Sequence, residues 1–142
     1  MRIGVTGSRT WKNKGIITAA FDDIEVTHPV VIIEGGNPRG ADRLCRAEAW
    51  SRGWHVATVE ALWNYYGKSA GHIRNDVMTT MELHLWLAFI CPCDKKDCPV
   101  PAPHDSHGTS GGIDRAKAAG IPVREYREEQ PGTSVSWVSD GS

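Results

Sequence analysis

Short, continuously apolar runs alternate along the chain with stretches whose apolar residues recur every three or four positions. The apolar runs predict buried strands at residues 2–6, 30–33, 55–59, 83–90 and 121–126. The periodic stretches predict helices at residues 14–24, 41–52, 70–81 and 113–119. Strands that are apolar on both faces and alternate with helices are typical of a parallel sheet covered on both sides. We therefore expect a single doubly wound α/β domain with a mostly parallel, five-stranded sheet.

The remaining segments set the expected domain limits. The α/β pattern occupies residues 1–126 and is interrupted by an irregular insertion, residues 91–107, which is rich in cysteine and histidine. Residues 127–142 are polar and contain little that could form a core, so we expect a disordered tail there. A chain of 142 residues is the length of one domain.

The composition limits which classes of partner and which location we expect. With 16 Lys and Arg against 17 Asp and Glu, the formal net charge is −1, which argues against a nucleic-acid partner. The chain has no apolar run of about 20 residues that could span a bilayer, and its first residues do not form a signal peptide, so we expect a cytoplasmic protein. Related folds are often dimers, so a homodimer is possible, although no surface stripe decides it.

Unusual residues follow four of the predicted strands. In doubly wound sheets, ligands bind beyond the carboxyl ends of the strands, where backbone N–H groups and helix N-termini attract phosphate. Arginines can grip phosphate, hydroxyls can donate hydrogen bonds, carboxylates can accept from ribose, and Trp63 can stack on a base. The candidate ligand-binding residues are Gly7, Ser8 and Arg9 after the first strand, Glu34, Gly35, Gly36, Arg39, Gly40 and Asp42 after the second, Trp63, Arg74 and Asn75 after the third, and Gly108, Thr109, Ser110 and Gly111 after the fourth.

Plainer explanations exist for single members of this set. Glycine-rich turns between strand and helix also occur because the turn is tight. Arg9 can simply cover the surface, Trp63 can belong to the core, and Asp42 can be an ordinary charge at a helix start. Several glycine-rich loops at one sheet edge, with arginines beside them, favour a phosphorylated ligand over these explanations.

Four blocks of the sequence together resemble a known family. VTGSRTW, IIEGGNPRGADRLC, LWNYYGKSAGHIRNDVM and HGTSGGIDRAKAAGIPV, in this order, are similar to the YspA-related branch of the SLOG superfamily, a group of Rossmann-like domains from bacteria and phages. The resemblance extends over the chain to about residue 126. It implies a nucleotide or nucleotide-derived ligand, bound by a sensor or binding module.

More distant relatives are the LOG-type phosphoribohydrolases, which release the base from a nucleoside 5′-monophosphate. Their motif is matched by Arg74 and by Gly108 with Thr109, but glycine stands at positions 111 and 112, where the catalytic glutamate is expected. An oxocarbenium-like transition state needs a nearby carboxylate, so a binding role is favoured. The alternative is such a hydrolase, in which Arg74 steadies phosphate and Asp114 or Glu34 is the acid/base. Other relatives bind single-stranded DNA, which the net charge disfavours here, and a scaffold with a vestigial pocket is a third class.

The insertion carries a candidate metal site. Its spacing is Cys-x-Cys-x4-Cys-x5-His-x2-His, formed by Cys91, Cys93, Cys98, His104 and His107. Four sulfur and nitrogen ligands are typical of structural zinc, and a metal would order a segment with few apolar residues. We expect zinc bound by Cys91 or Cys93 with the other three, pinning the loop at residues 108–111. The alternatives are free cysteines in a mobile loop, or a His107 that belongs to the ligand site.

Overall fold

The predicted parallel sheet is confirmed, and one further strand is added to it. A computed structural model describes residues 1–27, 29–94, 98–100 and 103–128, and the backbone of residues 136–140. The strands run in the order β3-β2-β1-β4-β5-β6. The first five are parallel, and β6 pairs antiparallel with β5. Their bounds are β1 Arg2–Gly7, β2 Val31–Glu34, β3 His55–Thr58, β4 Leu85–Ile90, β5 Val123–Arg127 and β6 Ser136–Asp140.

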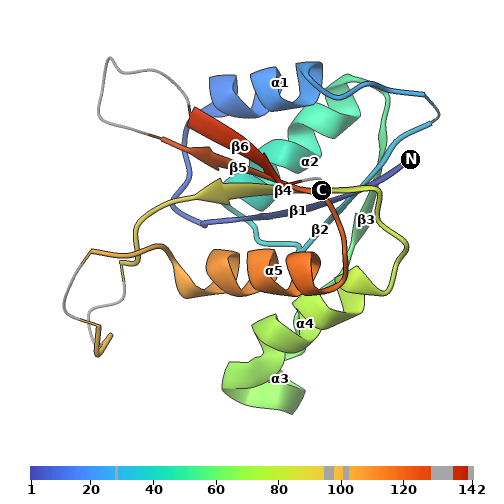
Figure 1. Ribbon diagram of the computed structural model, residues 1–142. Coiled ribbons are helices and arrows are strands. Elements are labelled where there is room, and N and C mark those ends of the chain that lie inside the picture. The colour runs from blue at the N-terminus through green and yellow to red at the C-terminus, as the bar shows by residue number, and fades with distance from the viewer. Residues whose placement is uncertain (28, 95–97, 101–102, 129–135, 141–142) are drawn as a thin grey trace.

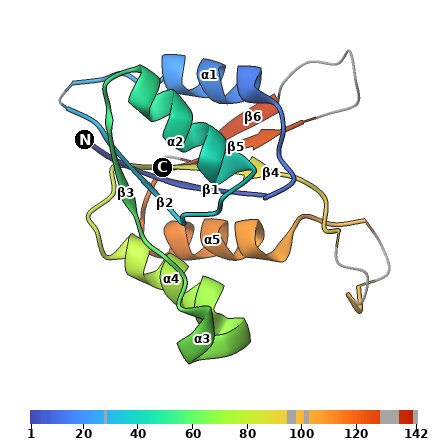
Figure 2. The same cartoon turned by 180° about the vertical axis from the view of Figure 1, so that it is seen from behind.

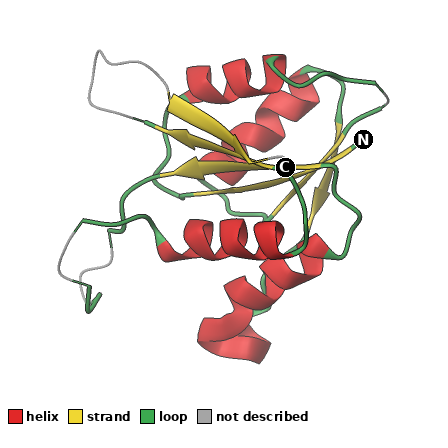
Figure 3. Ribbon diagram, in the orientation of Figure 1, coloured by secondary structure: helices red, strands yellow, loops and turns green. Residues whose placement is uncertain are grey.

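Helices cover both faces of the sheet in a doubly wound, Rossmann-like arrangement. They are α1 Lys14–Asp22, α2 Ala41–Ser51, α3 Trp63–Tyr66, α4 Ala70–Thr79 and α5 His107–Ala118, with a 3-10 turn, η1, at Gly67–Ser69. α1 and α2 lie on one face and α4 and α5 on the other, while α3 extends beyond α4 away from the sheet (Figures 1 and 2). Figure 3 shows the resulting three layers, helix, strand and helix.

The core follows from the apolar alternation of the central strands. In β4, Leu85, Leu87 and Phe89 pack into the cluster under α1 and α2. The intervening Trp86, Ala88 and Ile90 belong to the cluster under α4 and α5. β1 and β4 lie side by side in the middle of the sheet, and the chain moves from β1 to β2 in one direction and from β4 to β5 in the other. The order of the strands therefore reverses between them, which opens a crevice at their carboxyl ends.

Three element predictions differ from the structure. α5 begins at His107, six residues before the predicted start, so the glycine-rich stretch after the insertion is helix and not loop. The short helix α3 was not predicted, because four residues carry no periodic signal. Ser136–Asp140 forms β6 within the segment for which the polar composition predicts disorder. A short edge strand that contains serines has the same composition as a polar tail. Residues 129–135 and 141–142 of that tail lie outside the described residues. Within the described part, no helix is long and apolar enough to cross a membrane.

Candidate functional site

A cavity of about 910 Å³ opens at the carboxyl ends of the parallel strands. Its walls are the segments that follow β1, β2, β3 and β4, together with the start of α5. These segments converge because parallel strands deliver their connections to the same edge of the sheet. The cavity therefore lies where the sequence predicted a ligand site.

Most of the predicted ligand-binding residues line this cavity. They are Gly7, Ser8, Arg9, Gly35, Gly36, Asp42, Trp63, Arg74, Asn75, Gly108 and Thr109. Five of the predicted residues are not among those that line it, namely Glu34, Arg39, Gly40, Ser110 and Gly111. Residues in the wall that the sequence did not single out as ligand-binding include Thr6, Thr10, Asn37, Glu60, Lys68, His72, Asp94 and Ser106. Glu60 and Asp94 lie in loops without a glycine pattern, so no local signal marked them, and Lys68 lies in η1, directly after Gly67.

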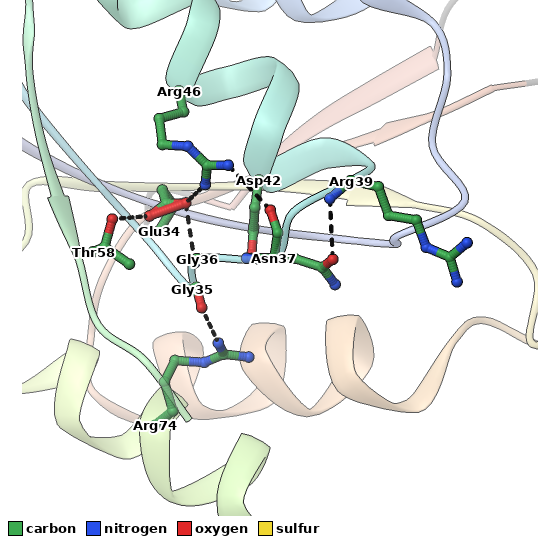
Figure 4. Close-up of polar contacts among 9 residues, drawn as sticks. All are labelled: Glu34, Gly35, Gly36, Asn37, Arg39, Asp42, Arg46, Thr58 and Arg74. Atoms are coloured by element: carbon green, nitrogen blue, oxygen red, sulfur yellow. Dashed lines mark hydrogen bonds and ion pairs between the residues drawn. The ribbon is translucent and has the colours of Figure 1, made fainter. Parts of the chain in front are cut away.

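Glu34 holds the loop between β2 and α2 rather than facing a ligand (Figure 4). Its side chain is fully buried and forms an ion pair with Arg46 of α2. The other contacts are donated by the hydroxyl of Thr58, at 2.7 Å, and the N–H of Gly36, at 3.0 Å. A carboxylate with these partners and no exposed surface is not presented to the cavity, so the geometry disfavours the expected acid/base role of Glu34.

Arg74 reaches the cavity from α4. Its Nη1 donates to the carbonyl of Gly35 at 3.1 Å, and its Nε donates to Asn75 Oδ1 at 2.9 Å (Figure 4). Its Nη2 has no hydrogen-bond partner among the described residues, which leaves the N–H donors of this charged nitrogen for a ligand. Arg39 instead points away from this group and its side chain is exposed (Figure 4).

Close packing explains two of the glycines in this loop. A Cβ on Gly35 would lie 2.0 Å from Nη1 of Arg74 and 3.0 Å from Oδ2 of Asp42, so only glycine lets the guanidinium approach. Gly40 has φ of 80°, and a Cβ there would lie 2.3 Å from the Cα of Arg9. Gly40 is therefore needed to bring two loops together, which is the structural explanation rather than the phosphate-binding one.

Asp42, unlike Glu34, lines the cavity. It is 6% exposed, and among the described residues it accepts one hydrogen bond, from the N–H of Asn37 at 3.2 Å. Burial raises the pKa of Asp42 from 3.8 to about 6, and the negative charge of Glu34 adds to the increase. The Asn37 bond and the positive charges of Arg74 and Arg46 act in the opposite direction. Such a group changes protonation close to neutral pH.

The first turn of α5 also lines the cavity. Thr109 is buried, and Asn75 of α4 donates to the carbonyl of Gly108 at 3.4 Å. Asp114, the other acid/base candidate, is exposed and does not line the cavity. A Cβ on Gly112 would lie 3.2 Å from both Thr6 and Trp86, which explains why a small residue occupies the position expected for glutamate.

Four of the five metal candidates come together. The ligating atoms of Cys93, Cys98, His104 and His107 all lie within 4.8 Å of one another and can hold a metal ion. Cys98 Sγ is 3.5 Å from His104 Nε2 and 3.4 Å from His107 Nε2. Cys91 lies outside the group and packs against the core. Of the two predicted ligand sets, the structure therefore selects the one that contains Cys93.

A bridge between the ends of the insertion holds this group in place. Pro92 and Asp105 form an antiparallel β-bridge, flanked by hydrogen bonds from Cys93 N to His104 O at 2.7 Å and from Ser106 N to Cys91 O at 3.0 Å. Asp105 also forms a two-bond ion pair with Arg127 of β5, which lowers the pKa of Asp105. The two ends of the insertion are thus joined to each other, and the end at Asp105 is tied to β5.

Comparison with known proteins places the chain in a family. Residues 1–66 match the model of the YspA, cpYpsA-related SLOG family. The gene 61 protein of Mycobacterium phage D29 is 32% identical over 135 residues, an alignment that covers 90% of this chain and 98% of that protein. The chain belongs to the YspA-related SLOG family. The family match spans β1 to α3, and therefore contains the β1 and β2 loops of the cavity but neither Arg74 nor the Cys/His group.

Proposed function

We propose that this SLOG protein binds a phosphorylated nucleoside in the cavity at the carboxyl ends of its strands. The observation that carries the proposal is that Nη2 of Arg74, which has no hydrogen-bond partner among the described residues, lies in the same cavity as the N-terminal turn of α5 and the β1 loop. A volume of about 910 Å³ lies within the usual range for small-molecule sites, about 300–1,000 Å³. Family membership supports a nucleotide-related ligand without naming it.

The charges of the lining suit a nucleotide better than a bare anion. Three cations, Arg9, Lys68 and Arg74, line the cavity together with three carboxylates, Asp42, Glu60 and Asp94. Cations and the α5 N-terminus would hold phosphate, while carboxylates would accept hydrogen bonds from ribose hydroxyls. Trp63 lines the cavity and is 60% exposed, so its ring is available to stack on a base.

The position of Asp42 in the cavity supports a second candidate function, the hydrolysis of a nucleoside 5′-monophosphate. The reaction consumes one water, breaks the bond between C1′ and the base, and yields ribose 5-phosphate and the protonated base. In this reading Asp42 activates the water and Arg74 steadies the phosphate. Both groups line the cavity, whereas Glu34 and Asp114 do not. A carboxyl group with a pKa of about 6 is suited to proton transfer near neutral pH.

The metal at the Cys/His group is, in this proposal, zinc in a structural role. Two thiolates and two imidazoles are a ligand set that zinc prefers in tetrahedral geometry. All four ligands come from the protein, so no coordination position is left for a substrate. Zinc here would order the insertion rather than take part in chemistry.

A melting-temperature screen tests the binding proposal. The compounds are nucleosides, their mono- and diphosphates, ADP-ribose, NAD and cyclic dinucleotides. A ligand at 100 times its Kd adds about 2.7 kcal/mol to the free energy of unfolding, which a melting curve detects. Stabilisation by phosphorylated compounds but not by nucleosides is expected, and no stabilisation by any of them contradicts the proposal. Chromatographic assay of base release then separates binding from hydrolysis: release of the base that is lost in Asp42→Asn supports the hydrolase, and ligand binding without any release supports the binding module.

A further inference from the structure

The metal group and the ligand cavity share a wall. Cys93 and His107 belong to the group of four metal-binding side chains and also line the cavity. Cys98 and His104 belong to the group but do not line the cavity. An ion held by these four residues therefore fixes two residues of the cavity wall without itself being part of the ligand site.

Ser8 connects the two sites through hydrogen bonds. Its hydroxyl accepts from the N–H of Cys91 at 3.1 Å and is 2.9 Å from the hydroxyl of Ser106. Ser106 in turn donates to Oγ1 of Thr109 at 2.9 Å. Cys91 and Ser106 lie at the two ends of the insertion, and both Ser8 and Thr109 are buried in the cavity wall. A displacement of the insertion therefore reaches the β1 loop and the first turn of α5.

The insertion has little else to keep it in this arrangement. Among its described residues, Val100 is 45% exposed and contributes little to the core. The bridge between Pro92 and Asp105 fixes only the base of the insertion. Chelation of an ion supplies the missing order, because metal-binding free energy becomes folding free energy of the segment that is ordered.

Resting on the proposed nucleotide function, we propose that metal binding at Cys93, Cys98, His104 and His107 regulates the cavity. Occupancy of the metal site orders the wall from Ser8 to Thr109 and raises the affinity of the cavity for its ligand. Thermodynamic linkage then requires the nucleotide to tighten metal binding by the same factor. Couplings of this kind are typically about 5- to 150-fold, and we expect about 10-fold here.

Two measurements on the full-length protein test this regulation. The first is hydrogen exchange of the backbone, followed by mass spectrometry, with zinc and after chelation. We expect zinc to slow exchange in peptides that contain Ser8 and Thr109. Cys98→Ser removes a metal ligand that does not line the cavity and should abolish the protection. Cys91→Ser, in the same insertion but outside the metal group, is the matched control: it keeps the backbone N–H that bonds Ser8, and zinc should still slow exchange in these peptides.

The second measurement is the Kd of the nucleoside monophosphate that stabilises the protein most in the melting screen, with AMP as the first probe. We expect the Kd to be about 10-fold weaker in chelated protein and in Cys98→Ser, with an equal change in the zinc Kd when nucleotide is present. Equal nucleotide affinity with and without zinc overturns the regulation but leaves the proposed function intact. Zinc-loaded protein that binds none of the nucleotides overturns the proposed function itself. Zinc protection confined to residues 93–105 overturns the connection through Ser8.

Discussion

Replacing Asp42 with asparagine should raise the free energy of unfolding at neutral pH, and should raise it by less at acid pH. The pKa of this buried carboxyl is about 6 in the folded protein against 3.8 in the unfolded chain. Between these values the folded state binds more protons than the unfolded state, so stability falls as the pH rises through this window. A pKa difference of about 2 corresponds to about 3 kcal/mol of stability, which the wild type has lost at pH 7.5. At pH 4.5 it has lost only about 1 kcal/mol.

Urea unfolding of wild type and Asp42→Asn at pH 4.5 and 7.5 measures this effect. The advantage of the variant should grow by about 2 kcal/mol between the two pH values, and effects of the substitution that do not depend on pH cancel in this comparison. Asp114→Asn removes an exposed carboxylate and controls for net charge. An advantage that stays constant, or shrinks as the pH rises, would refute the argument that Asp42 is held in the cavity at a cost to stability.

Three further substitutions test the loop after β2. Gly35→Ala places a methyl group 2.0 Å from Nη1 of Arg74, the flexible end of a side chain that can move away. The free energy of unfolding in urea should therefore fall by less than about 1.5 kcal/mol, while calorimetry should show a nucleotide Kd at least about 10-fold weaker. Unchanged nucleotide affinity contradicts the role of Arg74. Arg46→Met leaves Glu34 buried without its partner and should lower the free energy of unfolding in urea by about 3–5 kcal/mol. Adding Glu34→Gln should recover most of this loss. A double variant that is no more stable than Arg46→Met contradicts the buried ion pair as the cause. Gly40→Ala combines a φ of 80° with backbone atoms at 2.3 Å and should lower stability by more than about 2 kcal/mol, and an unchanged melting temperature would show that the loop can relax.

Periodicity was sufficient to predict the five parallel strands. The signal is strongest in the central strands β1 and β4, which are buried along almost their whole length, and weaker in β3 and β5, where polar residues are interspersed. It failed at the start of α5. Glycines at positions 108, 111 and 112 have low helix propensity, and packing of Gly112 against Thr6 and Trp86 overrides that preference. It also failed at β6, since a short edge strand that contains serines has the composition of a polar tail.

A cavity lies at the predicted edge because parallel strands bring their carboxyl ends together there, but the sequence could not assign roles within it. Glu34 and Asp42 are both acidic residues of the same loop, and only their three-dimensional neighbours separate a buried ion pair from a cavity carboxylate. Likewise, spacing alone left Cys91 and Cys93 as equal candidates for the metal group. The bridge between Pro92 and Asp105 decides between them, because it places Cys93 opposite His104.

The central claim is that the cavity binds the phosphate of a nucleoside phosphate through Arg74, and one calorimetric comparison tests it most directly. The nucleoside monophosphate that stabilises the protein most is titrated into wild type, Arg74→Gln and Arg39→Gln, with its bare nucleoside as reference. A charge-assisted hydrogen bond contributes about 1.5–3 kcal/mol, so Arg74→Gln should weaken the monophosphate Kd by about 10- to 150-fold. Arg39→Gln should leave it within about 3-fold, because Arg39 lies outside the cavity wall. Bare nucleoside that binds as tightly as the monophosphate, or equal losses in both arginine variants, would contradict the account.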